Sequence, residues 1–142
     1  MGGLQIYMIG LIVEDMSASL AFYRRLGLDV PPDTDSTHVE IEMAGGMMLF
    51  LDSSPQRWDP GFEPSPFPEP GTYRSLLEFY LESETNVKQK LDEMVNHGYR
   101  SVRDSYRTPF GMCFAFLDDP DGNTILLSGD SDPSQDRDNE PK

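Results

Sequence analysis

The chain has 142 residues and a formal net charge of −14 at pH 7, because 25 aspartate and glutamate residues oppose 11 lysine and arginine residues. This length predicts one domain. The charge argues against nucleic acid and anionic membranes as partners, since both are bound through clustered basic side chains, and it favours a cationic small molecule. The single cysteine, Cys113, excludes an internal disulfide and a thiolate-rich metal site.

The first elements along the chain are a predicted strand and a predicted helix. Residues 6–13 form a short apolar run rich in β-branched side chains, typical of a buried strand and too short to span a membrane. Asp15 or Ser17 can cap the next element, in which apolar residues recur at helical spacing until Gly27 ends it. Because the apolar start of the chain, residues 1–13, lacks the basic region of a signal peptide, we expect a cytoplasmic protein.

Two further strands complete the first half of the chain. Residues 38–42 alternate polar and apolar side chains, as a half-buried strand does. A glycine turn at 45–46 leads into residues 47–51, which form an apolar strand.

A proline-rich segment, residues 53–71, separates the two halves and holds six of the 12 prolines. Proline lacks a backbone donor and has a restricted φ, so we expect neither a helix nor an inner strand here. The segment also carries Trp58, Phe62 and Phe67. These aromatic side chains indicate that it packs on another part of the protein or forms a flap.

The second half repeats the order of the first. A strand at 76–81 precedes a cap at Ser83 or Thr85 and a helix that ends at His97 and Gly98. Three further strands are predicted, so that a strand, a helix and later strands occur twice along the chain. The three strands are at residues 99–102, 111–117 and 124–127, the last after a turn at 119–122.

Three motifs, in the right order, resemble the vicinal oxygen chelate superfamily, which includes glyoxalase I, bleomycin-resistance proteins and extradiol dioxygenases. The first is residues 13–28, where Asp15 and an apolar residue precede Ser-Leu, a small residue, Phe-Tyr and finally Leu-Gly. The others are Pro-Phe-Gly at 109–111 and Asp-Pro-Asp-Gly-Asn at 119–123.

This resemblance implies an α+β fold in which two tandem βαβββ modules form a curved mixed sheet around a ligand cavity. Module one would cover residues 4–52, the proline-rich linker 53–72 and module two 73–128. The acidic residues 129–142 would form a disordered tail. The resemblance also implies a homodimer, in some relatives built by exchange of modules.

Enzymes of this superfamily hold a divalent metal with His and Glu side chains from both modules. The positions that match those ligands are Met8, Leu76 and Leu126, with Phe50 at or near the fourth. Hydrocarbon side chains cannot ligate a metal, and thioether sulfur suits only soft ions. We therefore expect neither a metal nor another cofactor.

Other reactive side chains have simpler interpretations. His38, Glu40 and Glu42 share one strand face, but alternate residues stand about 6.6–7 Å apart and cannot close on one ion, so we expect a solvated face. His97 is interpreted as a helix cap and Cys113 as a small core residue.

Glu78 is the candidate functional residue. In residues 76–81 the odd positions should pack on the helices, so that Glu78 and Tyr80 face the implied cavity. There Glu78 could pair with a cationic ligand or act as an acid–base group; alternatively it could reach water or Arg103 or Arg107. Tyr80 and Phe110 could be stacking walls or plain core. The expected ligand-binding residues are Met8, Ile12, Phe50, Glu78, Tyr80, Phe110 and Leu126.

We therefore expect a metal-free member of this superfamily that binds a small aromatic or cationic organic molecule, with antibiotic sequestration as the leading form. One alternative is a metal-independent isomerase or lyase that uses Glu78 as its acid–base group. Another is a structural paralogue that binds no ligand.

Overall fold

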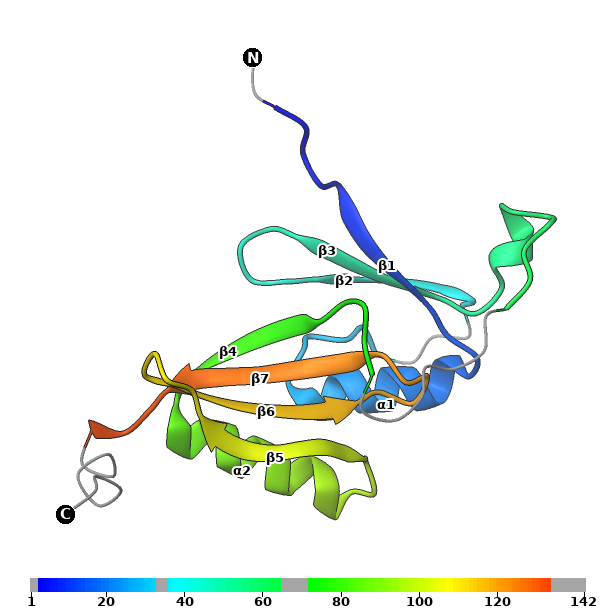
Figure 1. Cartoon of the computed structure of the whole chain (residues 1–142). Helices are drawn as coiled ribbons and strands as arrows, with labels where there is room; N and C mark the ends of the chain where they lie inside the picture. The colour runs from blue at the N-terminus through cyan, green and yellow to red at the C-terminus, as the bar shows by residue number, and fades with distance from the viewer. Residues whose placement is uncertain (1–2, 33–35, 65–71, 134–142) are drawn as a thin grey trace. The chain divides into compact units, whose positions relative to one another are not determined.

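The computed structural model describes residues 3–32, 36–64 and 72–133, and the chain divides into two compact units (Figure 1). Unit 1 is Met1–Pro66 and unit 2 is Phe67–Lys142. The combination of helices with mixed sheets is the predicted α+β class. None of the helices in the described ranges has the length and apolar character needed to cross a membrane.

Unit 1 contains one helix and a mixed sheet of three strands in the order β1-β3-β2. β1 runs parallel to β3, and β2 runs antiparallel to it. The resemblance implied a third strand after the helix, but the described residues of unit 1 form two. The elements are β1 (Met8–Ile12), α1 (Met16–Leu26), β2 (His38–Glu42), β3 (Met48–Asp52) and the short 3-10 helix η1 (Pro55–Arg57).

Local signals set the ends of helix α1 as predicted. Of the two possible caps, Asp15 is the one used, and its Oδ1 accepts a hydrogen bond from the backbone N–H of Ala18 at 3.1 Å. Gly27 ends the helix at φ +125°, a backbone conformation that favours glycine.

The sheet of unit 1 has an apolar face and a mixed face, as the strand register shows. The apolar side chains are Ile9, Leu11, Val39, Ile41, Leu49 and Leu51. Helix α1 contacts β3 and buries Leu20, Phe22, Tyr23 and Leu26. The opposite face, called the His38 face below, consists of Met8, Gly10, Ile12, His38, Glu40, Glu42, Met48, Phe50 and Asp52.

The proline-rich segment departs from its prediction in one respect. Pro55 opens one turn of 3-10 helix, because proline at the first position loses no helical hydrogen bond. Trp58 remains more than half exposed, but its indole N–H bonds within unit 1. Phe62 is half-buried, whereas Phe67 lies outside the described residues.

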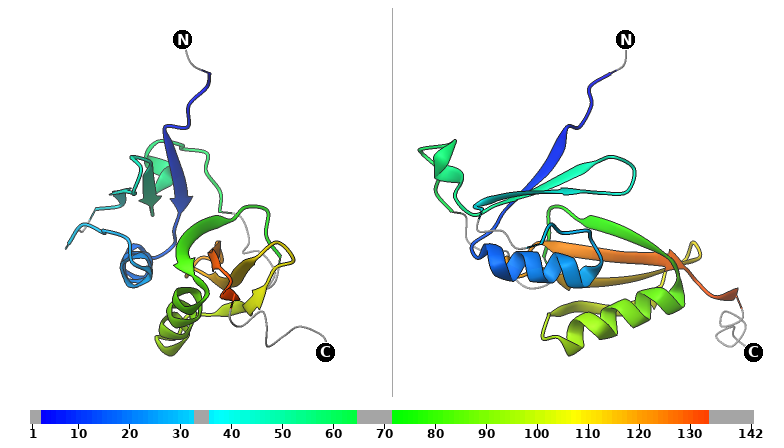
Figure 2. Two further views of the ribbon diagram at one scale, coloured as in Figure 1. Left: turned by 90° about the vertical axis from the view of Figure 1, so that its left-hand side faces the viewer. Right: turned by 180° about the vertical axis from the view of Figure 1, so that it is seen from behind.

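Unit 2 contains a four-stranded sheet in the order β4-β7-β6-β5, with helix α2 along one face (Figure 2). β4 runs parallel to β7, and the other pairs are antiparallel. The elements are β4 (Leu77–Ser83), α2 (Glu84–Asn96), β5 (Ser101–Arg107), β6 (Met112–Asp118) and β7 (Thr124–Asp130).

Helix α2 has the predicted caps at both ends. Ser83 Oγ accepts a hydrogen bond from the N–H of Asn86 at 3.1 Å. At the other end His97 is the cap, and its Nδ1 lies 2.9 Å from the carbonyl oxygen of Glu93. This contact is consistent with the interpretation of His97 as a helix cap.

Two strands of unit 2 extend further than the sequence pattern predicted. β5 continues to Arg107 and β7 to Asp130, so residues 129 and 130 belong to the sheet and the proposed tail starts too early. Ser131 also bonds through its N–H to the carbonyl of Gly111 at 3.0 Å. β7 is buried on both faces as far as Gly129.

One face of the unit 2 sheet packs on α2 and contains Leu77, Phe79, Cys113, Ala115, Leu117, Ile125 and Leu127. Cys113 is fully buried, and this burial raises the pKa of its thiol, in keeping with a core residue. The opposite face is called the open face below because α2 packs on the other side of the sheet. It contains Glu78, Tyr80, Arg103, Tyr106, Met112, Phe114, Phe116, Leu126 and Ser128, of which Phe116, Leu126 and Ser128 are buried.

A buried ion pair joins α2 to β5. Glu84 is 1% exposed, and its carboxylate accepts hydrogen bonds from Arg107 Nε at 3.0 Å and Nη2 at 3.2 Å. Lys88 Nζ lies 3.2 Å from the same carboxylate, and the N–H of Asp132 lies 3.4 Å from it. The Arg107 bonds, which outweigh the effect of burial, hold the pKa of Glu84 below its usual value.

Candidate ligand-binding site

Aromatic rings form a continuous row on the open face of unit 2. Phe116 stacks between Tyr73 and Tyr106, with ring centroids 5.8 Å and 6.4 Å away and interplanar angles of 19° and 7°. Phe114 meets Tyr106 edge-on at 6.1 Å and Phe110 edge-on at 5.9 Å. These are the parallel and edge-on arrangements that aromatic pairs prefer, so the rings form one connected apolar cluster on this face.

One line of paired residues across the four strands begins at Glu78 and ends at Arg103, with Phe116 of the aromatic row between them. Glu78 pairs with Leu126, Leu126 with Phe116, and Phe116 with Arg103. The Arg103 guanidinium lies 3.6 Å from the centroid of the Tyr106 ring. Arg103 and Arg107 were the arginines that could have neutralised Glu78. Arg103 instead lies over Tyr106, and Arg107 binds Glu84.

Tyr80 is exposed on the open face, and its hydroxyl donates to Asp130 Oδ2 at 3.0 Å. This bond raises the pKa of Tyr80, because the phenolate would lie against a carboxylate. Phe110 is 70% exposed, whereas Leu126 is buried. Of the residues expected to bind ligand, Glu78, Tyr80 and Leu126 thus share the open face, and Phe110 contacts it through Phe114.

Met8, Ile12 and Phe50, the other residues expected to bind ligand, lie together on the His38 face of unit 1. Phe50 lies over Gly10, because a Cβ atom added to Gly10 would come within 2.0 Å of the ring. The Phe50 ring also stacks on His38 at a centroid distance of 5.0 Å. Gly10 therefore provides the space that this aromatic side chain needs.

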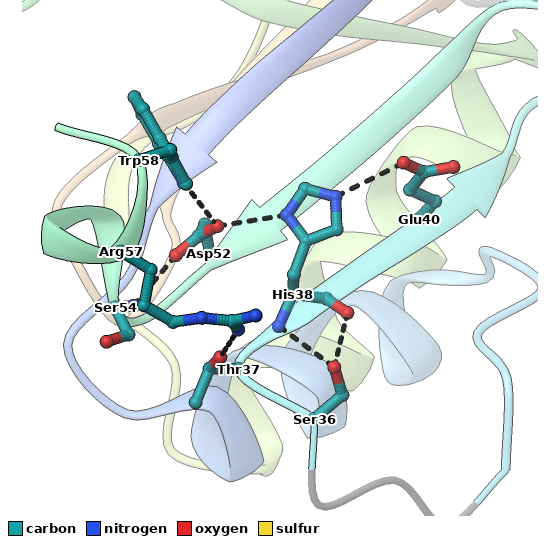
Figure 3. Close-up of polar contacts among 8 residues, drawn as sticks. All are labelled: Ser36, Thr37, His38, Glu40, Asp52, Ser54, Arg57 and Trp58. Atoms are coloured by element: carbon teal, nitrogen blue, oxygen red, sulfur yellow. Dashed lines mark hydrogen bonds and ion pairs between the residues drawn. The ribbon is translucent and has the colours of Figure 1, made fainter.

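A hydrogen-bonded cluster around His38 is the feature of unit 1 that sequence reasoning missed (Figure 3). His38 Nδ1 lies 2.9 Å from Asp52 Oδ2, and Nε2 lies 3.2 Å from Glu40 Oε2. Carboxylates only accept hydrogen bonds, so the protonated imidazolium satisfies both contacts. The bond to Asp52, with that to Glu40, raises the pKa of His38.

Asp52 is the buried anchor of this cluster, with 2% exposure. Its carboxylate also accepts from Trp58 Nε1 at 2.9 Å and from the N–H of Ser54 at 2.8 Å. Burial alone would raise the pKa of Asp52, but these bonds and that from His38 outweigh burial and lower it. His38 is therefore held in place by hydrogen bonds, whereas the sequence had predicted a solvated strand face. Its partner lies 14 residues away, so no local pattern indicated the pair.

The metal that this fold family implies does not fit the side chains at its matching positions. Phe50 and Leu126 offer only carbon atoms, and Phe50 is occupied in packing over Gly10 and His38. Across residues 3–32, 36–64 and 72–133, no three His, Cys, Asp or Glu side chains are grouped so that they could hold a metal ion.

Comparison with known proteins identifies the family. The model of the Glyoxalase/Bleomycin resistance protein/Dioxygenase superfamily matches residues 5–127, so the chain belongs to this superfamily, as its motifs indicated. A search of curated proteins finds no significant match.

Several solved structures share the fold at low sequence identity. A glyoxalase-related enzyme from Fulvimarina pelagi is similar with a TM-score of 0.73 at 23% identity, over 91% of this chain and 88% of that one. A lactoylglutathione lyase from Agrobacterium tumefaciens has a TM-score of 0.62 at 22% identity, over 88% and 92%. A hypothetical protein from S. aureus has a TM-score of 0.70 at 19% identity, over 90% and 95%.

Proposed function

We propose that the protein is a cytoplasmic, metal-independent binding protein for small aromatic cations, and that the open face of unit 2 holds the ring. The observation that carries the proposal is the aromatic row on the same face as Glu78, which forms no ion pair with the described residues. Sequestration of an aromatic drug is a form of this function that requires no turnover. The negative charge of the chain would attract such a cation.

The spacing of the open face suits an arylalkylamine. Glu78 and Phe116 lie two strands apart in one cross-strand line, which corresponds to about 10 Å at the usual strand spacing. A ring stacked near Phe116 can therefore direct an ammonium group on a short chain toward the Glu78 carboxylate. Tyr80, on the same strand as Glu78, would close the side of this position.

The variant Glu78→Gln tests the role of the carboxylate. Because Glu78 is exposed, its pair with an ammonium should be worth about 1 kcal/mol, or roughly a fivefold loss of affinity. We expect this loss for tyramine and none for para-ethylphenol, which lacks the amine. Titrations followed by nuclear magnetic resonance measure both.

Glu93→Gln is the matched control, since it removes one charge from α2, on the other side of the unit 2 sheet. It should leave both affinities as in the wild type, whereas added salt should weaken only tyramine. Equal losses for the two probes in Glu78→Gln would show that this residue shapes the site without pairing with the cation.

We also propose that the chain forms a homodimer. The family resemblance suggests it, and the residues ahead of the edge strand β1 expose large apolar side chains at Leu4, Ile6 and Tyr7. Light scattering should then give twice the chain mass of 16.0 kDa. A mass of one chain at every concentration would contradict the proposal.

A further inference from the structure

Ser128 carries a buried hydroxyl group for which the described residues provide no hydrogen-bond partner. It lies in β7 on the open face, is fully buried, and its Oγ has no hydrogen-bond partner among the described residues. A buried hydroxyl without a partner has lost its bonds to water without replacement and so lowers stability. Such groups are few in native proteins and each calls for a reason.

The strand register places Ser128 inside the proposed ligand site. It pairs with Tyr80 on β4 and with Phe114 on β6, so it lies between an exposed phenol and the aromatic row. The Tyr80 hydroxyl donates to Asp130 and makes no hydrogen bond with Ser128 Oγ. Neither strand neighbour therefore bonds the Ser128 hydroxyl.

Ser128 and Glu78 are diagonal neighbours across adjacent strands. Glu78 pairs with Leu126, two residues before Ser128 on the same face, and the usual strand spacing and rise per residue put such diagonal positions about 8 Å apart. A para-hydroxylated phenethylamine carries its oxygen and its ammonium at opposite ends of the molecule. One ligand of that kind could engage both residues with its ring between them, over Leu126, whose cross-strand neighbour is Phe116.

We infer that Ser128 is a ligand-recognition residue, whose hydroxyl donates a hydrogen bond to an oxygen substituent on the ring of the bound cation. The ligand class is then the phenolic or otherwise ring-oxygenated arylalkylamines. This inference rests on the proposed function, since it assigns a second polar contact within the same site. It adds selectivity, because a ring without oxygen leaves the buried hydroxyl unbonded.

Two measurements on the full chain test the inference. The first compares tyramine with phenethylamine, which lacks only the ring hydroxyl, in titrations followed by nuclear magnetic resonance. The wild type should bind tyramine about tenfold more tightly. In Ser128→Ala this ratio should fall to about one while the affinity for phenethylamine is retained.

The second measurement is thermal unfolding without ligand. Ser128→Ala removes an unsatisfied buried hydroxyl, so its Tm should rise by about 2–4 °C. Ser19→Ala is the matched control: Ser19 is equally buried in α1, but it has an interaction partner. Its replacement should lower the Tm and leave the tyramine preference unchanged.

The outcomes separate this inference from the proposed function. If phenethylamine and tyramine bind the wild type equally well and both depend on Glu78, the inference is overturned and the proposed function stands. An unchanged preference in Ser128→Ala, or a Tm that falls, also overturns the inference. If neither amine binds the wild type saturably, the proposed function itself is overturned, and the inference with it.

Discussion

Replacing Arg107 with methionine should lower the free energy of unfolding by about 3–5 kcal/mol, because it leaves the Glu84 carboxylate buried without its main partner. Lys88 also contacts Glu84 but is half exposed, so it can replace only part of the lost interaction. Urea unfolding of the wild type and of Arg107→Met measures the difference.

Two further variants show whether the loss comes from the buried charge. Arg103→Met changes another arginine of β5, whose guanidinium lies over the Tyr106 ring on the open face. This variant should lower the free energy of unfolding by about 1 kcal/mol or less. The double variant Glu84→Met with Arg107→Met removes both charges and should recover most of the stability. A double variant as unstable as Arg107→Met would contradict this explanation.

The Glu84 pair also predicts a pH dependence. Its pKa is lowered on folding from the usual 4.5, so its contribution to stability is complete above that pH and is lost as the pH falls through the lower folded value. Unfolding measured at successive acidic pH values should therefore show a steeper loss in the wild type than in the double variant. Equal slopes would show that the pair does not produce this pH dependence.

Replacing Asp52 with alanine should cost about 1.5–3 kcal/mol, since it deprives His38, Trp58 and the N–H of Ser54 of a charged acceptor. Trp58 should then lose its anchor, and its fluorescence should shift toward that of a solvated indole. Trp58→Phe is the matched control, because it removes the indole donor but keeps an aromatic ring and the Asp52 carboxylate. It should cost less than Asp52→Ala.

The same cluster sets the pH range in which it stabilises unit 1. The pKa of His38 is raised from 6.5, so its contribution is complete below that pH and is lost as the pH rises through the folded value. The pKa of Asp52 is lowered from 3.8, so its contribution is complete above that pH and is lost as the pH falls. The cluster therefore stabilises most between about pH 4 and 6.5.

Asp52→Asn isolates this linkage with little change of shape. It should lower the pKa of His38, which titration of the imidazole ring signals by nuclear magnetic resonance measures directly. His97, which bonds to Glu93 in α2, supplies reference signals in the same spectra. A His38 titration that is the same in Asp52→Asn and in the wild type would show that Asp52 does not hold the imidazolium.

Local chemistry in the sequence was enough to predict the two helices and the approximate positions of the strands, but not the 3-10 helix or the full lengths of β5 and β7. Asp15 and Ser83 cap the helices, Gly27 ends α1, and residues 38–42 form the expected strand because each signal acts within a few residues. The motif at residues 13–28 then indicated the superfamily, which the family model confirms. Strand alternation also placed Glu78 and Tyr80 on one face, since that follows from the period of two.

Only the tertiary structure decided which of these side chains meet. Asp52 reaches His38, and Glu84 reaches Arg107 23 residues along the chain, because strand register brings distant residues together. The pairing of β4 with β7 likewise sets Ser128 beside Tyr80. Alternation assigns a residue to a face, but its neighbours on that face depend on pairing between strands far apart in sequence, which no local pattern encodes.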